Sequence, residues 1–134
     1  MLPLARILLV EDDPGDVAYA LDEFAAHELR NPVTVLGDGA AALEYLARGP
    51  VPDILLLDLN LPGVDGRVVL DHVVVDPALA RLVVVVLTGV DVEERTLRDF
   101  GVPSAYHFRK PVDVAQLAGL IRSVEQFSIG AGGA

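Results

Sequence analysis

The chain has 134 residues, no cysteine and a net charge of −10, and 52% of its residues are hydrophobic. One domain of this size can bury a single core, and the lack of cysteine excludes a disulfide framework, a thiolate nucleophile and a zinc–thiolate site. The acidity argues against nucleic-acid binding, because the phosphate backbone would be repelled by most of this surface.

Nothing in the sequence indicates a membrane protein. The longest wholly apolar run, Leu82–Leu87, is far shorter than the roughly 20 residues of a spanning helix. The first ten residues carry Pro3 and Arg6 and lack the small-residue cleavage site of a secretory signal. We therefore expect a cytoplasmic protein.

In chain order, short apolar runs alternate with segments of helical spacing. The first run is Ile7–Val10, and the helix expected after it has Asp13 as its N-cap and Pro14 at its first position. The other runs of strand character are Val33–Leu36, Ile54–Leu57, Val83–Leu87 and Ala105–Phe108. The other helical segments are Ala40–Ala47, Gly66–Val74, Val92–Phe100 and Val114–Gln126.

Five strand–helix units in succession predict an α/β fold. Runs this rich in Val, Ile and Leu are typical of parallel strands buried on both faces, and each connection should be right-handed. The chain should therefore form one open, doubly wound sheet with helices on both faces. We expect this domain to span residues 1–128 and a flexible tail to span residues 129–134.

Polar residues end or follow four of these strands, where an open α/β sheet binds its ligands. In chain order they are Glu11, Asp12, Asp58, Thr88 and Lys110. Any one of them alone would be an ordinary loop or strand-end residue. Together they place three acids, a hydroxyl and an amine on one edge of the sheet.

This set of groups suits phosphoryl transfer. Crowded carboxylates repel one another, and a hard divalent cation such as Mg²⁺ would neutralise them while keeping water and phosphate as further ligands. Lys110 and the Thr88 hydroxyl could bind phosphoryl oxygens. Asp58 is then free to act as the nucleophile and form an acyl phosphate.

These residues resemble the response-regulator receiver family from Ile7 to about Phe127. The matching segments are ILLVEDDP (7–14), DILLLDLNLPGVDG (53–66), VVVLTG (84–89) and RKP (109–111). The spacing matches as well, since Thr88 lies thirty residues after Asp58 and Lys110 lies twenty-two after Thr88.

The resemblance implies a flavodoxin-like sheet with strand order 2-1-3-4-5 and five helices. It implies that a sensor histidine kinase phosphorylates Asp58, and that Asp12, Asp58 and the backbone carbonyl of Asn60 bind Mg²⁺ with Glu11 in an outer shell. Such a domain is a signalling switch, whose enzymatic activity is limited to its own phosphorylation and dephosphorylation.

The resemblance also implies a switch in which Thr88 and Lys110 sense phosphate and an aromatic residue three positions before the lysine rotates inward. Here that position holds His107, with Tyr106 and Phe108 on either side. Either His107 is the rotating group, or a strand shift lets Tyr106 serve, or the coupling is weak.

More narrowly, the chain resembles the single-domain regulators that accompany phytochrome-type sensor kinases. The shared features are the VEDDPGDV start, the 46-residue step from Asp12 to Asp58, DLNLPGVDG and the closing SVEQF. We expect a homodimer through the fourth helix, fifth strand, fifth helix and C-terminal stretch. The last helix has more apolar residues than one side needs to cover a sheet: Val114, Leu117, Leu120, Ile121, Val124 and Phe127. We expect Leu117, Leu120 and Val124 to pack inward, and Phe127, at the helix end where little sheet remains to be covered, to meet the second subunit.

Other functions fit this sequence less well. A Mg²⁺-dependent phosphohydrolase with an aspartate nucleophile needs a general acid two residues later, where Asn60 stands. A nucleotide or flavin binder needs a Gly-rich or Ser/Thr-rich phosphate loop after the first strand, where EDDP presents negative charge. A receiver that only binds proteins fits poorly, because every phosphorylation residue is present.

Overall fold

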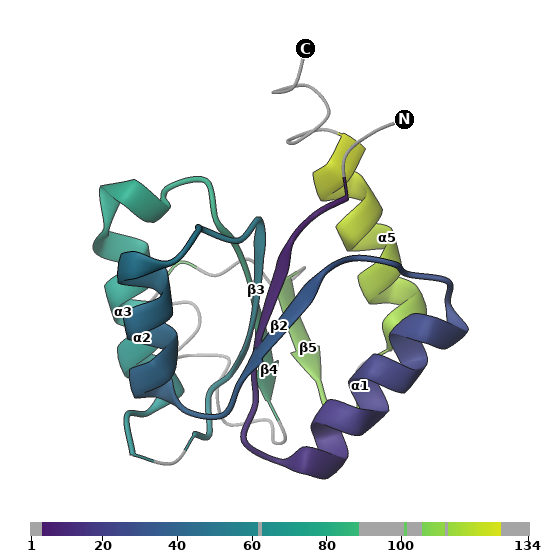
Figure 1. Ribbon diagram of the computed structural model, residues 1–134, viewed down its shortest axis with the longest axis horizontal. Helices are drawn as coiled ribbons and strands as arrows, with labels where there is room; N and C mark the ends of the chain where they lie inside the picture. The colour runs from purple at the N-terminus through teal and green to yellow at the C-terminus, as the bar shows by residue number, and fades with distance from the viewer. Residues whose placement is uncertain (1–3, 62, 89–100, 102–105, 112, 127–134) are drawn as a thin grey trace.

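The computed structural model describes residues 4–61, 63–88, 101, 106–111 and 113–126 (Figure 1). The strands are β1 (Ile7–Val10), β2 (Val33–Leu36), β3 (Ile54–Asp58), β4 (Val83–Thr88) and β5 (His107–Arg109). The α-helices are α1 (Pro14–Ala26), α2 (Gly39–Arg48), α3 (Gly66–Val75) and α5 (Val114–Val124), and a short 3-10 helix, η1, spans Pro77–Leu79.

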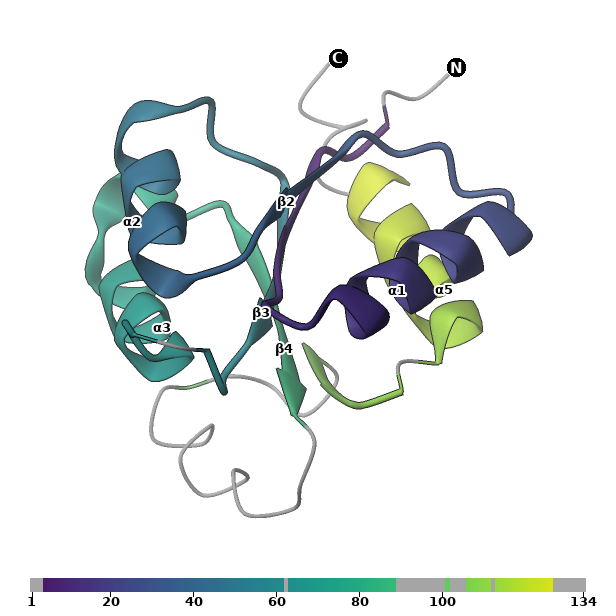
Figure 2. The ribbon, with the colours of Figure 1, turned by 60° about the horizontal axis from the view of Figure 1, so that its bottom comes forward.

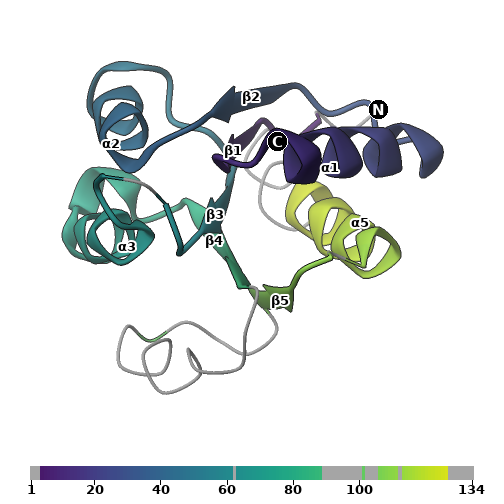
Figure 3. The same cartoon turned by 90° about the horizontal axis from the view of Figure 1, so that it is seen from below.

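All five strands are parallel and form one sheet in the order β2-β1-β3-β4-β5 (Figure 3). β1 pairs with β2 on one side and with β3 on the other, so Leu9 lies between Val35 and Leu56. The strand order reverses at β1, and the helices that follow β1 and β3 lie on opposite faces of the sheet (Figure 1). The carboxyl ends of these two strands are therefore where the fold can receive a ligand.

Alternate residues of the central strands build two hydrophobic cores, one on each face of the sheet. The residues that β1 and β3 contribute to one core are Leu8, Val10, Leu55 and Leu57, and those that they contribute to the other are Ile7, Leu9, Ile54 and Leu56. Helices α2 and α3 cover the first core, and α1 and α5 cover the second (Figure 2). All eight side chains are buried, and burial of each contributes about 1.5–3 kcal/mol. The strands that carry the candidate acids are thus firmly placed.

Every α-helix among the described residues begins at an aspartate that caps it. The side chains of Asp13, Asp38, Asp65 and Asp113 accept hydrogen bonds from backbone N–H groups in the first turns of α1, α2, α3 and α5. Each such cap contributes about 1 kcal/mol. In α1, Asp13 binds the N–H groups of Gly15 and Asp16, which fixes the first turn beside the end of β1.

Where the strands begin, at the opposite end from the candidate acids, the chain before β1 is tied to the end of α5. Glu125 Oε2 accepts the backbone N–H of Ala5 at 2.6 Å and the side-chain amide of Asn31 at 2.8 Å. The same amide donates to the Ala5 carbonyl at 2.9 Å. We call these three residues the Glu125 clasp.

The predicted fold class and strand order are confirmed, and element bounds agree within two residues where both are described. The expected burial of β2 on both faces is wrong: Thr34 and Val35 are exposed, because β2 is an edge strand. The predicted helix Val92–Phe100 and the tail 129–134 lie outside the described residues, and the domain limits stay a prediction. None of the described helices is long and apolar enough to cross a membrane.

Candidate functional site

Three carboxylates meet at the carboxyl ends of β1 and β3. Glu11 and Asp12 follow β1 directly, and Asp58 is the last residue of β3. One oxygen from each lies within 4.8 Å of the other two. Glu11 and Asp58 are buried and Asp12 is exposed. Buried like charges this close are unfavourable unless a cation compensates them, so this edge requires a positive partner.

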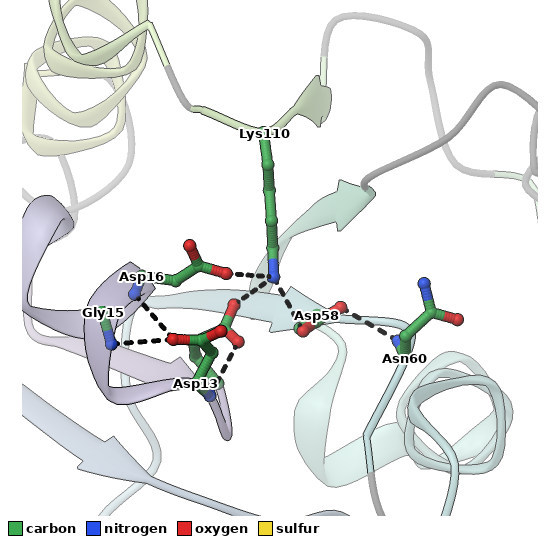
Figure 4. A network of polar contacts seen from close by, with 7 residues as sticks. Asp13, Gly15, Asp16, Asp58, Asn60 and Lys110 are labelled. Carbon is green, nitrogen blue, oxygen red and sulfur yellow. Dashed lines mark hydrogen bonds and ion pairs between the residues drawn. The ribbon is translucent and has the colours of Figure 1, made fainter.

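Lys110, the only lysine in the chain, places its positive charge in this cluster. Its ammonium nitrogen lies 2.5 Å from Glu11 Oε2, 2.9 Å from Asp58 Oδ2 and 3.1 Å from Asp16 Oδ2 (Figure 4). The backbone N–H of Lys110 donates to the Thr88 carbonyl at 2.8 Å, which fixes the base of the side chain. Each of the three ammonium N–H donors thus has one carboxylate partner.

Asp58 is also held by the segment that follows it. Its Oδ1 accepts the backbone N–H of Asn60 at 2.9 Å, while Oδ2 faces Lys110 (Figure 4). Gly66, at the start of α3, lies against the Asp58 backbone, and a Cβ there would stand 2.3 Å from the Asp58 carbonyl oxygen. Glycine is therefore required for α3 to pack this close to the candidate nucleophile.

Thr88 and His107 form a second polar contact at this edge. Thr88 is the buried last residue of β4, and its Oγ1 lies 2.7 Å from Nε2 of the half-buried His107, the first residue of β5. The imidazole tautomer determines which of the two donates. Tyr106, the alternative switch residue, is also half-buried. The hydroxyl expected to sense phosphate is thus engaged with the residue three positions before Lys110.

Burial and the ion pairs change the proton affinity of two groups. Burial raises the pKa of the Glu11 carboxyl from 4.5 to about 7; the nearby Asp58 charge adds to the rise, and the contacts with Lys110 and the Asp13 N–H oppose it. Burial acts to lower the pKa of Lys110, but its bonds to Glu11, Asp58 and Asp16 outweigh burial and raise that pKa above its ordinary value. Lys110 therefore stays protonated near neutral pH, whereas Glu11 titrates there.

We expect the metal-free protein to lose stability between about pH 4.5 and pH 7 because of Glu11. Folded Glu11 keeps its proton up to about pH 7, whereas an ordinary glutamate loses it near 4.5. The contribution to stability is therefore full below pH 4.5 and is lost as the pH rises through the folded pKa. Over this pH range the unfolding free energy of the wild type should fall by about 2 kcal/mol because of Glu11, and that of Glu11→Gln should not show this fall. Urea denaturation in EDTA measures both profiles.

Glu44→Gln is the matched control for this measurement, since Glu44 is an exposed residue of α2. Its stability profile should follow the wild type across the pH range. Parallel profiles for the wild type and Glu11→Gln would contradict the expectation.

The structure brings the predicted residues together at one edge, while their roles stay predictions. Asp16 was not among them, because an acid in the first turn of a helix is ordinary. Its contact with Lys110, 94 positions away, depends on how α1 packs against α5. The only available signal was its position five residues after Glu11, beside the same edge of the sheet.

The site suits a hard divalent cation and a phosphoryl group. Clustered carboxylate oxygens are the ligands that Mg²⁺ prefers, and an ammonium group beside them can bind phosphoryl oxygens. Asn60 cannot act as a general acid, and the acids after β1 are unfavourable to a nucleotide phosphate bound there.

Comparisons with known proteins agree with this chemistry. The family model for the response regulator receiver domain matches residues 7–122. The response regulator Rcp1 of Synechocystis sp. is 32% identical over 131 residues, which cover 93% of this chain and 89% of that protein.

Solved structures of similar proteins include phytochrome response regulators. The bacteriophytochrome response regulator AtBRR is 35% identical with a TM-score of 0.79, covering 91% of this chain and 93% of that one. The Mn²⁺-bound form of Rcp1 is 30% identical, and the phosphorylated cyanobacterial phytochrome response regulator RcpA is 32% identical. Each of these two has a TM-score of 0.71 and covers 93% of this chain and 94% of that one.

Proposed function

The chain belongs to the response regulator receiver family, and on that basis we propose that Asp58 accepts a phosphoryl group from a sensor histidine kinase. The observation that carries the proposal is the position of Asp58, beside two other acids and 2.9 Å from the only lysine. The similarity to phytochrome response regulators, one of them phosphorylated, favours a phytochrome-type kinase as the donor.

In the proposed reaction, a carboxylate oxygen of Asp58 attacks the phosphorus of a phosphohistidine on the kinase. The O–P bond forms as the P–N bond breaks, and the imidazole, protonated on its other nitrogen, leaves as neutral histidine. Lys110 would bind a phosphoryl oxygen and stabilise the negative charge that develops there. The Asn60 N–H, 2.9 Å from Asp58 Oδ1, orients the carboxylate.

We propose that Asp12, Asp58 and the backbone carbonyl of Asn60 bind Mg²⁺, with Glu11 in an outer shell. Such an ion would neutralise the acids and attract the phosphoryl oxygens. The proposal is supported by the clustering of the three carboxylates within 4.8 Å and by the binding of Mn²⁺ in the similar Rcp1 structure. The pairing of Glu11 with Lys110 at 2.5 Å is consistent with its outer position.

We further propose that Thr88 senses the phosphate and that His107 transmits the signal. The 2.7 Å contact between the Thr88 hydroxyl and His107 supports this pairing over one with Tyr106. If the Thr88 hydroxyl donates to the imidazole, turning that O–H to a phosphoryl oxygen breaks the contact, so His107 is released to a new orientation.

A homodimer and a cytoplasmic location complete the proposal. The predicted dimer face includes the fourth helix and the C-terminal stretch, which lie outside the described residues. Val114, Leu117, Ile121 and Val124 of α5 are buried in the core of the monomer, and Leu120 packs half-buried against it, so the expected inward packing of Leu117, Leu120 and Val124 is confirmed. Phe127, on which the expected dimer contact mainly depends, lies outside the described residues, so self-association stays a prediction.

The direct test is phosphorylation of the chain by a small donor. Incubation with acetyl phosphate and Mg²⁺ should add one phosphoryl group, detected by intact mass, and hydroxylamine should remove it because it cleaves acyl phosphates. EDTA should block the labelling, because the uncompensated acids repel the anionic donor. A label that resists hydroxylamine, or that forms equally in EDTA, would contradict the proposal.

The same experiment distinguishes the alternative, a Mg²⁺-dependent phosphohydrolase with an aspartate nucleophile. Such an enzyme would release phosphate over many rapid turnovers while little labelled chain accumulates. A receiver should instead accumulate label, with phosphate release limited by slow loss of its own phosphoryl group.

A further inference from the structure

Asp16 differs from the other two partners of Lys110. Glu11 and Asp58 belong to the acidic cluster with Asp12 and are buried, whereas Asp16 lies outside that cluster and its side chain is 46% exposed. Asp16 also comes from a different element, the first turn of α1, whose N–H groups at Gly15 and Asp16 are held by the Asp13 cap (Figure 4). It is therefore a fixed acceptor at the margin of the site.

This difference becomes important when the site is in use. A cation in the acidic cluster and a phosphoryl group on Asp58 would both draw on the carboxylates that now hold Lys110. Of the three partners, Asp16 alone lies outside that cluster, so a cation there does not compete for its contact with the ammonium group, 3.1 Å away. A cavity of about 240 Å³ borders Lys110 and Asp16, so an unrestrained lysine has space to move away from Asp58.

We propose that Asp16 is a positioning residue for phosphoryl transfer, which holds the Lys110 ammonium with one N–H directed at the Asp58 side. The inference rests on the proposed function, because it concerns the same lysine and the same phosphoryl acceptor. Asp16 does not touch the reacting atoms, and its effect passes through Lys110.

Asp16 also has a second effect on phosphorylation, which opposes the first and can be measured separately from it. A carboxylate this close also repels an anionic donor, so its removal lowers the donor concentration that gives the half-maximal rate. Loss of positioning instead lowers the maximal rate, because the lysine no longer waits in the geometry that the transition state requires. The two effects change different kinetic constants.

The experiment measures phosphorylation of the full chain by acetyl phosphate in saturating Mg²⁺, over a range of donor concentrations. Asp16→Ala should lower the maximal rate about tenfold. Asp16→Asn, whose amide oxygen still accepts a hydrogen bond, should fall between Asp16→Ala and the wild type, and Asp16→Glu should restore at least part of the rate. Asp22→Ala removes the same charge from an exposed position of α1 and should leave the rate unchanged.

A spectroscopic measurement complements the kinetics. Because Lys110 is the only lysine, selective ¹⁵N-lysine labelling gives a single side-chain ammonium signal. On addition of Mg²⁺, this signal should stay sharp in the wild type and in Asp22→Ala, and should broaden in Asp16→Ala as the ammonium loses its one acceptor outside the acidic cluster.

The possible outcomes are distinguishable. Equal maximal rates and equal ammonium signals in the wild type and Asp16→Ala would overturn the inference, and so would a change confined to the half-saturating donor concentration. A wild-type chain that takes no label at all would instead refute the proposed function. Circular dichroism tests whether each variant is folded. If Asp16→Ala is not folded, Asp16→Asn takes its place in the comparison with the wild type.

Discussion

Asp58→Asn should reduce acetyl phosphate labelling of the chain to background. An amide is not a nucleophile near neutral pH, yet it has nearly the size of the carboxylate and keeps an oxygen that can face Lys110. The variant should therefore fold, and it should be at least as stable as the wild type in EDTA, because it removes one of the crowded buried acids. Intact mass and urea denaturation measure the two properties.

The control for this prediction is Asp22→Asn, which removes a charge from the exposed face of α1 and should label normally. Asp12→Asn should keep the nucleophile but require more Mg²⁺ for the same rate, since it removes a proposed ligand. Labelling that persists in Asp58→Asn would place the phosphoryl group on another residue and refute the assignment of Asp58.

Thr88→Ala should still be phosphorylated and should lose most of the conformational response. The hydroxyl is proposed to report the phosphate, whereas Asp58 forms the bond. Replacing it also leaves His107 Nε2 without the partner now 2.7 Å away, at a cost of about 1 kcal/mol in stability. Amide NMR spectra with and without beryllofluoride measure the response, and Thr88→Ser, which retains the hydroxyl, should respond as the wild type does.

Variants of the two candidate switch residues separate the remaining alternatives. If His107 transmits the signal, His107→Ala should show spectral changes confined to the region around Asp58, while Tyr106→Ala keeps the wider response. The reverse result would assign the switch to Tyr106. Equal spectral shifts in Thr88→Ala and the wild type would mean that Thr88 is not the sensor.

The strands and the site edge could be predicted because apolar runs mark buried parallel strands. The apolar runs end one residue before the strands do, and the polar residues expected at the strand ends, Asp58, Thr88 and Arg109, are the last residues of β3, β4 and β5. Backbone pairing continues regardless of side-chain polarity, as the pairs Asp58–Leu87 and Thr88–Arg109 demonstrate. The candidate functional groups are thus part of the rigid sheet.

Other features depended on tertiary contacts that no local pattern encodes. The pairing of Asp16 with Lys110 and the contact of Thr88 with His107 join residues 94 and 19 positions apart. The exposure of β2 follows from its place at the edge of the sheet, which its apolar sequence does not reveal. In each case the sequence shows the residue type, but the packing of distant segments determines which residue lies beside it.

The Glu125 clasp bears on how the molecule forms and how long it lasts. Ala5 and Glu125 are separated by 120 positions, so their hydrogen bond closes a long loop, which is entropically costly until the elements between them have packed. A contact of this kind is expected to be absent from the folding transition state. Weakening it would therefore speed unfolding and leave the folding rate nearly unchanged. The clasp thus prolongs the lifetime of the folded state without guiding the chain towards it.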